Sequence, residues 1–210
     1  MNEHLLDKTL LTPRQPATTQ AADGMLRRAW SLAEIEAMVR AGIIDEDERF
    51  EMIGGEVVPM SPKGARHEMV KIDLNRHFQQ IAPAHLSIAP ETTLRLDERS
   101  FVEPDFCVFP RDLDLKSLDG SRVLLAVEVA DTSLYYDLGR KIGIYAAYGI
   151  REVWVVNALT LVTRVHRRLG ASGYSDIIDH DYSAIITPML VPELATGLAA
   201  LGLTPSQIQS

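Results

Sequence analysis

The chain has 210 residues, of which 46% are hydrophobic, 24% charged and 6% aromatic, which is typical of a globular protein and excludes a disordered or fibrous chain. No run approaches the roughly 18 consecutive apolar residues of a membrane span. Lysine and arginine total 21 against 29 aspartate and glutamate residues, a formal net charge of −8, which disfavours tight, non-specific nucleic-acid binding and suits a protein that gathers carboxylates around a divalent metal.

The first 24 residues are polar and aperiodic, which predicts a flexible tail (1–24) in front of a single domain (25–204). They lack the cationic start and apolar core of a secretory signal. The single cysteine, Cys107, excludes an internal disulfide framework and a multi-cysteine zinc site, and we interpret it as a small buried side chain. These features together favour a cytoplasmic protein.

The N-terminal half predicts two helices separated by a hairpin. Ser31 and Glu34 have the spacing of a capping box, so a helix is expected from Ser31 to about Gly42. Residues 49–60 predict two short strands around a Gly54-Gly55 turn. A second helix is expected over Ala65–Ile81, because apolar residues recur there at helical spacing and Pro83 follows.

The remainder of the chain is rich in predicted strands. A helix at about Tyr136–Tyr148, between strands at 123–129 and 152–156, predicts a crossover that makes those two strands parallel neighbours. The last residues predict only a short helix that frays. The other expected strands cover residues 86–89, 92–96, 104–109, 159–168 and 174–178. This order predicts an α/β (α+β) fold with a mixed β-sheet flanked by helices.

Two carboxylates in apolar strands are the leading candidates for chemistry. Glu128 interrupts a strand that is otherwise apolar on both faces, and burying it is costly unless a partner compensates its charge. Asp105 begins another such strand, with Cys107 and Phe109 on its face by alternation. A buried ion pair would explain Glu128, and a turn would explain Asp105. Together they also predict a site for a hard divalent cation such as Mg²⁺ or Mn²⁺.

Further candidates are less specific. Lys141, early in the predicted 136–148 helix, could reach this site and stabilise charge on a phosphate, or it could form a surface pair with Asp137. Glu51, on the predicted hairpin, could be a further metal carboxylate or a strand-edge charge. Glu56 and His67 carry the same ambiguity, and a lone histidine at a helix start is more often a capping or surface residue.

The ordered motifs FEMIGGEVVPMSP, Arg66-His67-Glu68, EPDFCVF, LLAVEVADTS and YYDLGRKIGIYAAYGIREVWVVN resemble the Uma-two family of the PD-(D/E)XK restriction-endonuclease-like superfamily. The resemblance covers about residues 31–157. It implies a restriction-endonuclease-like fold in which Asp105 and Glu128 are the motif acids. The usual lysine would stand at Ala130, and the resemblance implies that Lys141 replaces it. Glu51 and the Val129 carbonyl are the other implied metal contacts.

The resemblance implies a Mg²⁺- or Mn²⁺-dependent endonuclease that hydrolyses DNA phosphodiester bonds, with weak, metal-dependent DNA binding. Two-fold pairing of nuclease sites favours a homodimer. Ala130 and the acidic charge also allow a catalytically inactive module of the same fold that binds nucleic acid or a protein partner. An enzyme acting on another phosphate-containing substrate is a third hypothesis. Without metal, clustered carboxylates should repel, so the pKa of one of them is expected to be raised.

Overall fold

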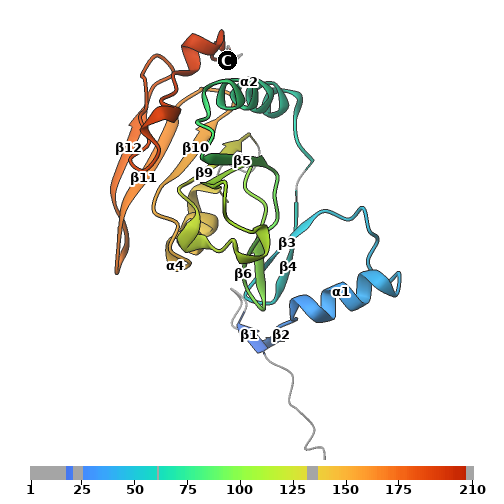
Figure 1. The fold of residues 1–210 in the computed structure, drawn as a ribbon. Helices are drawn as coiled ribbons and strands as arrows, with labels where there is room; N and C mark the ends of the chain where they lie inside the picture. The colour runs from blue at the N-terminus through green and yellow to red at the C-terminus, as the bar shows by residue number, and fades with distance from the viewer. Residues whose placement is uncertain (1–17, 21–25, 61, 132–136, 207–210) are drawn as a thin grey trace, which may run out of the picture.

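A computed structural model of the chain describes residues 18–20, 26–60, 62–131 and 137–206. It contains a six-stranded sheet, a four-stranded sheet and a two-stranded ribbon (Figure 1). The mixed sheet with helices against it confirms the predicted fold class. No helix in the described ranges is long and apolar enough to cross a membrane.

The six-stranded sheet is the centre of the molecule. Its strand order is β12-β11-β10-β9-β8-β5, with β9 and β10 parallel and every other neighbouring pair antiparallel. The parallel pair confirms the predicted crossover, which contains the π-helical turn η3 and helix α4. The elements are β5 (Leu86–Pro90), β8 (Phe106–Pro110), β9 (Leu125–Ala130), η3 (Asp137–Lys141), α4 (Ile142–Ala147), β10 (Val153–Asn157), β11 (Thr163–Gly170) and β12 (Gly173–His180).

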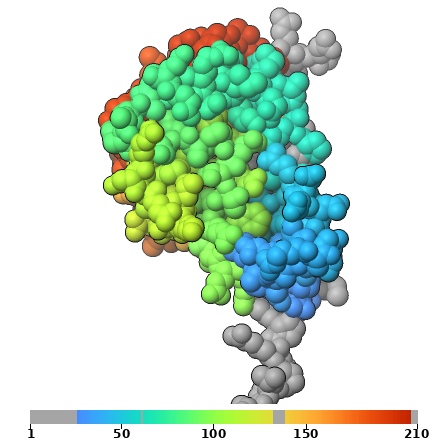
Figure 2. Space-filling view, turned by 45° about the vertical axis from the view of Figure 1, so that its right-hand side comes forward, coloured from blue at the N-terminus to red at the C-terminus, as the bar shows by residue number. Residues whose placement is uncertain are grey.

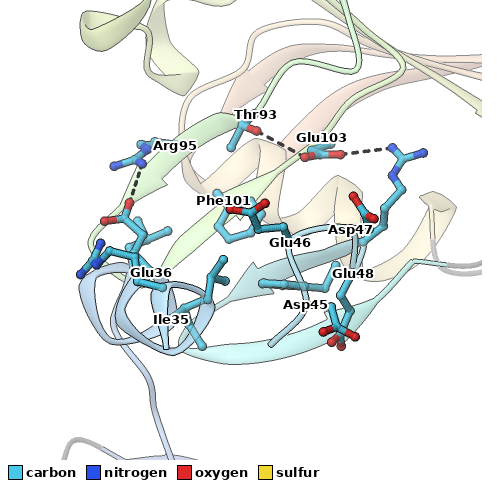
Figure 3. Close-up of a pocket in the computed structure, with 15 residues that line it drawn as sticks. Ile35, Glu36, Asp45, Glu46, Asp47, Glu48, Thr93, Arg95, Phe101 and Glu103 are labelled. Carbon is cyan, nitrogen blue, oxygen red and sulfur yellow. Dashed lines mark hydrogen bonds and ion pairs between the residues drawn. The ribbon is translucent and has the colours of Figure 1, made fainter. Parts of the chain in front are cut away.

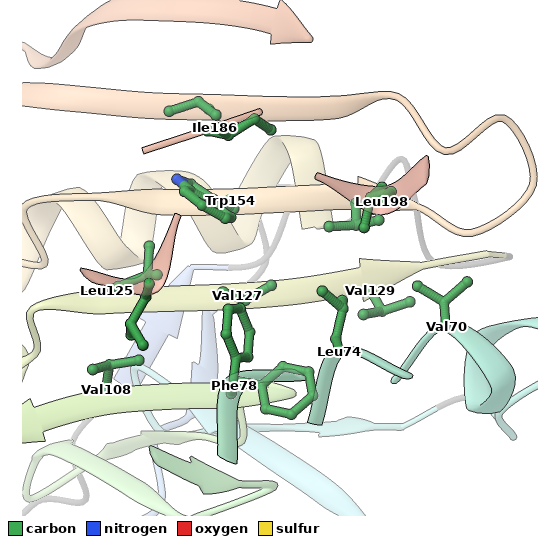
Figure 4. Close-up of a cluster of buried hydrophobic side chains, with 14 of the residues drawn as sticks. Val70, Leu74, Phe78, Val108, Leu125, Val127, Val129, Trp154, Ile186 and Leu198 are labelled. Atoms are coloured by element: carbon green, nitrogen blue, oxygen red, sulfur yellow. The ribbon is translucent and has the colours of Figure 1, made fainter. Parts of the chain in front are cut away.

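One face of this sheet is covered by helix α2 (Ala65–Ile81) and by the C-terminal segment with the short helices η4 (Pro192–Leu194) and η5 (Leu198–Leu201). Phe78 of α2 meets Phe106 of β8 edge to face, with ring centroids 5.5 Å apart. Val127 and Val129 of β9 point into the same core (Figure 4). The apolar stripe predicted for α2 therefore builds the larger core.

The opposite face of β9 has small side chains. Ala126 and Ala130 point there, together with Glu128 between them. Tyr145 of α4 packs onto this face and is fully buried. Because side chains alternate along a strand, Glu128 lies between the apolar Ala126 and Ala130 on the α4 side of β9.

The four-stranded sheet has the order β4-β3-β7-β6 and is antiparallel at each pairing. Its strands are β3 (Phe50–Ile53), β4 (Glu56–Pro59), β6 (Leu94–Asp97) and β7 (Ser100–Val102), and helix α1 (Leu32–Arg40) covers it. The predicted capping box of α1 is present. In Figure 2 the blue residues of α1 and its neighbours form a lobe beside the green and teal surface of the larger body.

The β3–β4 hairpin needs its glycines. Gly54 and Gly55 have φ of 60° and 87°, a conformation that glycine adopts without the steric penalty of a side chain. A Cβ on Gly55 would also lie 2.7 Å from that of Ala29. The predicted hairpin is confirmed, and its turn packs against the residues that lead into α1.

The structure places three further segments for which strands or a tail were expected. The strand expected at 92–96 is β6, which lies in the four-stranded sheet. The strand expected at 159–168 begins only at Thr163, because the Asn157 side chain accepts hydrogen bonds from the next backbone amides and forms a turn. Within the predicted tail, β1 (Thr18–Gln20) pairs with β2 (Leu26–Arg28), and residues 1–17 and 21–25 lie outside the description.

The core also contains an unusual histidine. His166 on β11 is 4% exposed, and neither of its ring nitrogens has a hydrogen-bond partner among the described residues. Burial, assisted by the charge of Arg164, lowers its pKa to about 4. Because the unfolded chain binds this proton at about pH 6.5, stability falls as the pH drops from about 6.5 towards 4.

We therefore expect His166→Phe to flatten the pH dependence of unfolding. Between pH 7 and pH 4 the wild-type free energy of unfolding should fall on the order of 2 kcal/mol more than that of the variant. Urea denaturation across this pH range measures the difference. The exposed His85 provides the control, since His85→Gln should leave the profile unchanged; an unchanged profile in His166→Phe would contradict the assignment.

Candidate active site

Glu128 is buried, and three elements meet at its side chain. It is 3% exposed. Tyr145 of α4 donates its hydroxyl to Oε1, and Lys141 Nζ lies 2.9 Å from the same oxygen. The carboxylate is therefore stabilised by a cation and a hydroxyl from the crossover that follows its own strand, which compensates the cost of burial.

Lys141 joins two carboxylates from different sheets. Its Nζ also lies 2.9 Å from Oε1 of Glu51 on β3, and the side chains of Lys141 and Glu51 are both 4% exposed. The amide of Glu103 donates to Glu51 at 2.8 Å. A lysine this buried is not part of a solvent-exposed helical pair, and the side chain of its alternative partner Asp137 lies outside the described part of the chain.

Lys141 is the last residue of the π-helical turn η3, immediately before α4. Such turns are rare and shift the direction of the side chains that follow them. Ala130, where the superfamily lysine would stand, faces the same side of the sheet as Glu128 and is fully buried. The crossover helix thus brings a lysine to Glu128, whereas β9 itself has none.

Asp105 lies directly before β8 and is also buried. Its Oδ2 accepts hydrogen bonds from the amide of Val129 at 2.8 Å and from His67 Nε2 at 3.2 Å, and its Oδ1 accepts one from Lys63 Nζ at 3.0 Å. Since Val129 follows Glu128 on β9, the bond to its amide holds the Asp105 carboxylate beside that strand. The structure therefore brings Asp105, just before β8, next to the residue that follows Glu128 on β9.

The charges around Asp105 act on its proton affinity. Burial opposes ionisation, but the His67 hydrogen bond and the charge on Lys63 outweigh it and hold the pKa of Asp105 at about 2. For Asp105 this is opposite in sign to the raised pKa expected of a metal-free carboxylate cluster, because its carboxylate oxygens contact hydrogen-bond donors and a lysine.

Sequence patterns did not identify three residues near Asp105, namely Lys63, Lys71 and Glu91, and left the role of a fourth, His67, open. His67 is buried on α2, with Nδ1 3.3 Å from Glu68 Oε1 and Nε2 towards Asp105, so it is not a surface residue. Lys63, Lys71 and Glu91 form an ion-pair cluster next to it. Lys63 lies in the Pro-Lys-Gly stretch before α2, and this stretch has no sequence pattern that would indicate a site. Glu56, by contrast, pairs with Arg140 at 2.9 Å.

Asp105 and Glu128 carry donors of the type that a hard cation such as Mg²⁺ takes, since carboxylate oxygens are its usual protein ligands. No group of three or more His, Cys, Asp or Glu residues in metal-binding geometry occurs in the described ranges. Mg²⁺ commonly uses only one or two carboxylates and keeps several waters, so the chemistry of these two side chains is compatible with such an ion.

A groove of about 670 Å³ lies apart from these acids, between α1 and the four-stranded sheet. Figure 3 shows its apolar floor, with Ile35 and Phe101, and the acidic residues 45–48 at its rim. Glu103 borders both regions, because its side chain lines the groove and pairs with Arg49 at 3.2 Å while its amide binds Glu51. The groove is therefore adjacent to the candidate site but separate from it.

Comparison with known proteins identifies the family. Residues 32–200 match Uma2, described as "Putative restriction endonuclease". The chain belongs to the Uma2 family. A crystal structure described as a putative nuclease belonging to DUF820 from Anabaena variabilis ATCC 29413 is similar, with a TM-score of 0.64 and 12% identity over 81% of this chain and 96% of that one. The similarity of the two structures supports the fold described above for this chain. The comparison with curated proteins gives no match.

Replacing Lys141 with methionine should strongly destabilise this Uma2 protein. The change keeps the aliphatic stem but leaves Glu51 and Glu128 buried without their shared cation. We expect the free energy of unfolding to fall by about 3–5 kcal/mol, as measured by urea denaturation at pH 7.

The neighbouring Arg140 provides a matched control. Its side chain is 49% exposed in its pair with Glu56, so Arg140→Met should cost no more than about 1 kcal/mol. Equal losses of stability in the two variants would show that the buried contacts of Lys141 with Glu51 and Glu128 stabilise the fold no more than the exposed Arg140–Glu56 pair does. Adding Glu128→Gln to Lys141→Met should recover part of the loss, because one buried charge is removed.

Proposed function

We propose that this Uma2 protein is a Mg²⁺- or Mn²⁺-dependent endonuclease that hydrolyses phosphodiester bonds in DNA. The observation that carries the proposal is the arrangement of two buried acids, Asp105 directly before β8 and Glu128 on the neighbouring β9, with the buried Lys141 in contact with Glu128. In this proposal Asp105, Glu128 and the Val129 carbonyl hold the cation, and Glu51 is the further carboxylate of the site. Family membership supports the reaction class.

A bound Mg²⁺ supplies an activated water and offsets the negative charge of the phosphate. The protein's own groups position the two carboxylates before substrate arrives. The Val129 amide fixes Asp105 at 2.8 Å, and Tyr145 fixes Glu128 from the helix side. Pre-organised ligands of this kind avoid reorganisation during the reaction.

Lys141 has the role that the strand lysine has in the superfamily pattern. Its Nζ is held between Glu51 and Glu128, so its position is fixed by two charge-assisted contacts. From there the ammonium group would orient the attacking water or offset charge on the scissile phosphate. Ala130 in β9 is thus compatible with activity, because the cation comes from the crossover.

The acidic chain, with a formal net charge of −8, repels DNA at long range. We therefore propose that DNA binding is weak, sensitive to salt and strengthened by the metal. The homodimer and the cytoplasmic setting stay predictions from the sequence.

Cleavage of supercoiled plasmid in the presence of Mg²⁺ or Mn²⁺ tests the proposal. Glu128→Gln and Asp105→Asn should each lower the rate by at least about 100-fold, because each removes a charged ligand of the activating metal. Calorimetric titration with Mn²⁺ should show binding by the wild type that Asp105→Asn loses.

Glu36→Gln is a suitable control, since Glu36 lies on α1 outside the proposed site and pairs with Arg95 of β6, and it should cleave as the wild type does. Activity that survives Glu128→Gln would rule out this site and indicate a contaminating nuclease. Absence of cleavage by the folded wild type with both metals would overturn the nuclease function itself.

A further inference from the structure

Three cations from three separate parts of the chain meet at a single carboxylate oxygen. Oε1 of Glu91 accepts from Lys63 Nζ, lies 3.1 Å from Lys71 Nζ and lies 3.5 Å from a terminal nitrogen of Arg49. Arg49 precedes β3, Lys63 precedes α2, and Lys71 lies within α2. Three cations around one anionic oxygen form the kind of arrangement that binds phosphate.

Each of the three cations also has a carboxylate partner of its own. Lys63 pairs with Asp105 at 3.0 Å, Lys71 with Glu68 at 2.9 Å and Arg49 with Glu103 at 3.2 Å. Glu91 is therefore the shared partner, and the cations remain anchored if it leaves. An incoming anion can replace the Glu91 carboxylate without leaving a buried cation unpaired.

The backbone at Glu91 is unfavourable for this residue type. Its φ is 48°, the left-handed region that a non-glycine residue adopts at a cost of order 1 kcal/mol or more. Glu91 directly follows β5, and its amide donates to the Asp105 carbonyl at 3.2 Å. Strained residues of this kind cluster at ligand-binding sites, and this one adjoins a proposed catalytic acid.

The cluster is open to solvent on one side. The side chains of Arg49 and Glu91 are 47% and 34% exposed, whereas those of Lys63 and Lys71 are 17% and 12% exposed. A polymer on the surface can therefore reach the shared oxygen position. Lys63 links that position directly to Asp105, so an anion bound there would lie next to the reacting group.

We propose that Arg49, Lys63 and Lys71 form a binding site for a DNA backbone phosphate beside the scissile one, and that Glu91 occupies this site until DNA displaces it. The identity of the ligand rests on the proposed nuclease function. The cluster gathers three cations at one position of an acidic chain, where each of them can donate to a phosphate oxygen once Glu91 has left.

Binding without metal tests this proposal independently of cleavage. The probe is a fluorescein-labelled DNA duplex of about 20 base pairs, titrated with the full chain in EDTA and followed by fluorescence anisotropy at several low salt concentrations. Glu91→Gln removes the competing charge and should tighten DNA binding by about threefold to tenfold. Lys71→Gln should weaken binding by a similar factor and reduce the slope of log K against log [salt] by about 1.

Two charge-matched variants control for net charge alone. Glu193→Gln removes an exposed acid on η4, and Lys116→Gln removes an exposed lysine on the short helix η1 (Leu115–Ser117). The proposal is overturned if Glu91→Gln binds no more tightly than Glu193→Gln, or if Lys71→Gln keeps the affinity and salt slope of Lys116→Gln. Should Glu91→Gln fail to fold, Arg49→Gln and Lys71→Gln decide the question by the same criterion.

The two proposals fail in different ways. A wild type that never cleaves, together with a Glu91→Gln variant that binds DNA more tightly, would overturn the nuclease function and leave the phosphate site standing. Metal-dependent cleavage that requires Glu128, together with unchanged binding by Glu91→Gln and Lys71→Gln, would overturn the phosphate site and leave the nuclease function standing.

Discussion

The ion pairs of the buried Lys141 ammonium group join the separate parts of this protein. This group contacts Glu51 of the four-stranded sheet and Glu128 of the six-stranded sheet, each at 2.9 Å. Without a cation, two carboxylates buried this close together would repel each other. The Tyr145 hydroxyl also donates to Glu128, and the Glu103 amide donates to Glu51. The relative placement of the two sheets and the crossover helix is therefore tied to one charge.

Each acid of the candidate site contacts a basic side chain although the chain as a whole is acidic. Lys141 contacts Glu51 and Glu128, whereas Lys63 and His67 contact Asp105. The same principle applies to Glu91, where the hydrogen bonds from Lys63 and Lys71 outweigh burial and lower the pKa to about 2. Other acidic residues lie outside the site, for example residues 45–48 at the rim of the α1 groove.

The sequence predicted those parts of the site that break a local pattern. Glu128 interrupts an apolar strand, so the local sequence alone indicates that this carboxylate is buried and needs a partner. The capping box and the β9–β10 crossover are likewise local signals, and the structure contains both. Lys63, Lys71 and Glu91 break no pattern, because each is a common surface residue type, and they become a cluster only when helix α2, the segment before it and the end of β5 meet. The position of β6 in a second sheet has the same cause, since alternation does not specify which strand is the neighbour.

Because Lys141 lies on the crossover, its compensation of the two buried acids depends on tertiary packing. A lysine on β9 would be held by the hydrogen bonds of a central strand. Lys141 instead precedes the six-residue helix α4, which is too short to persist in water without its contacts with the sheet. Local unfolding of this crossover would withdraw the cation and leave Glu51 and Glu128 facing each other. Repulsion between the two acids therefore raises the free energy of the locally unfolded state. For this reason the crossover should fold cooperatively with both sheets.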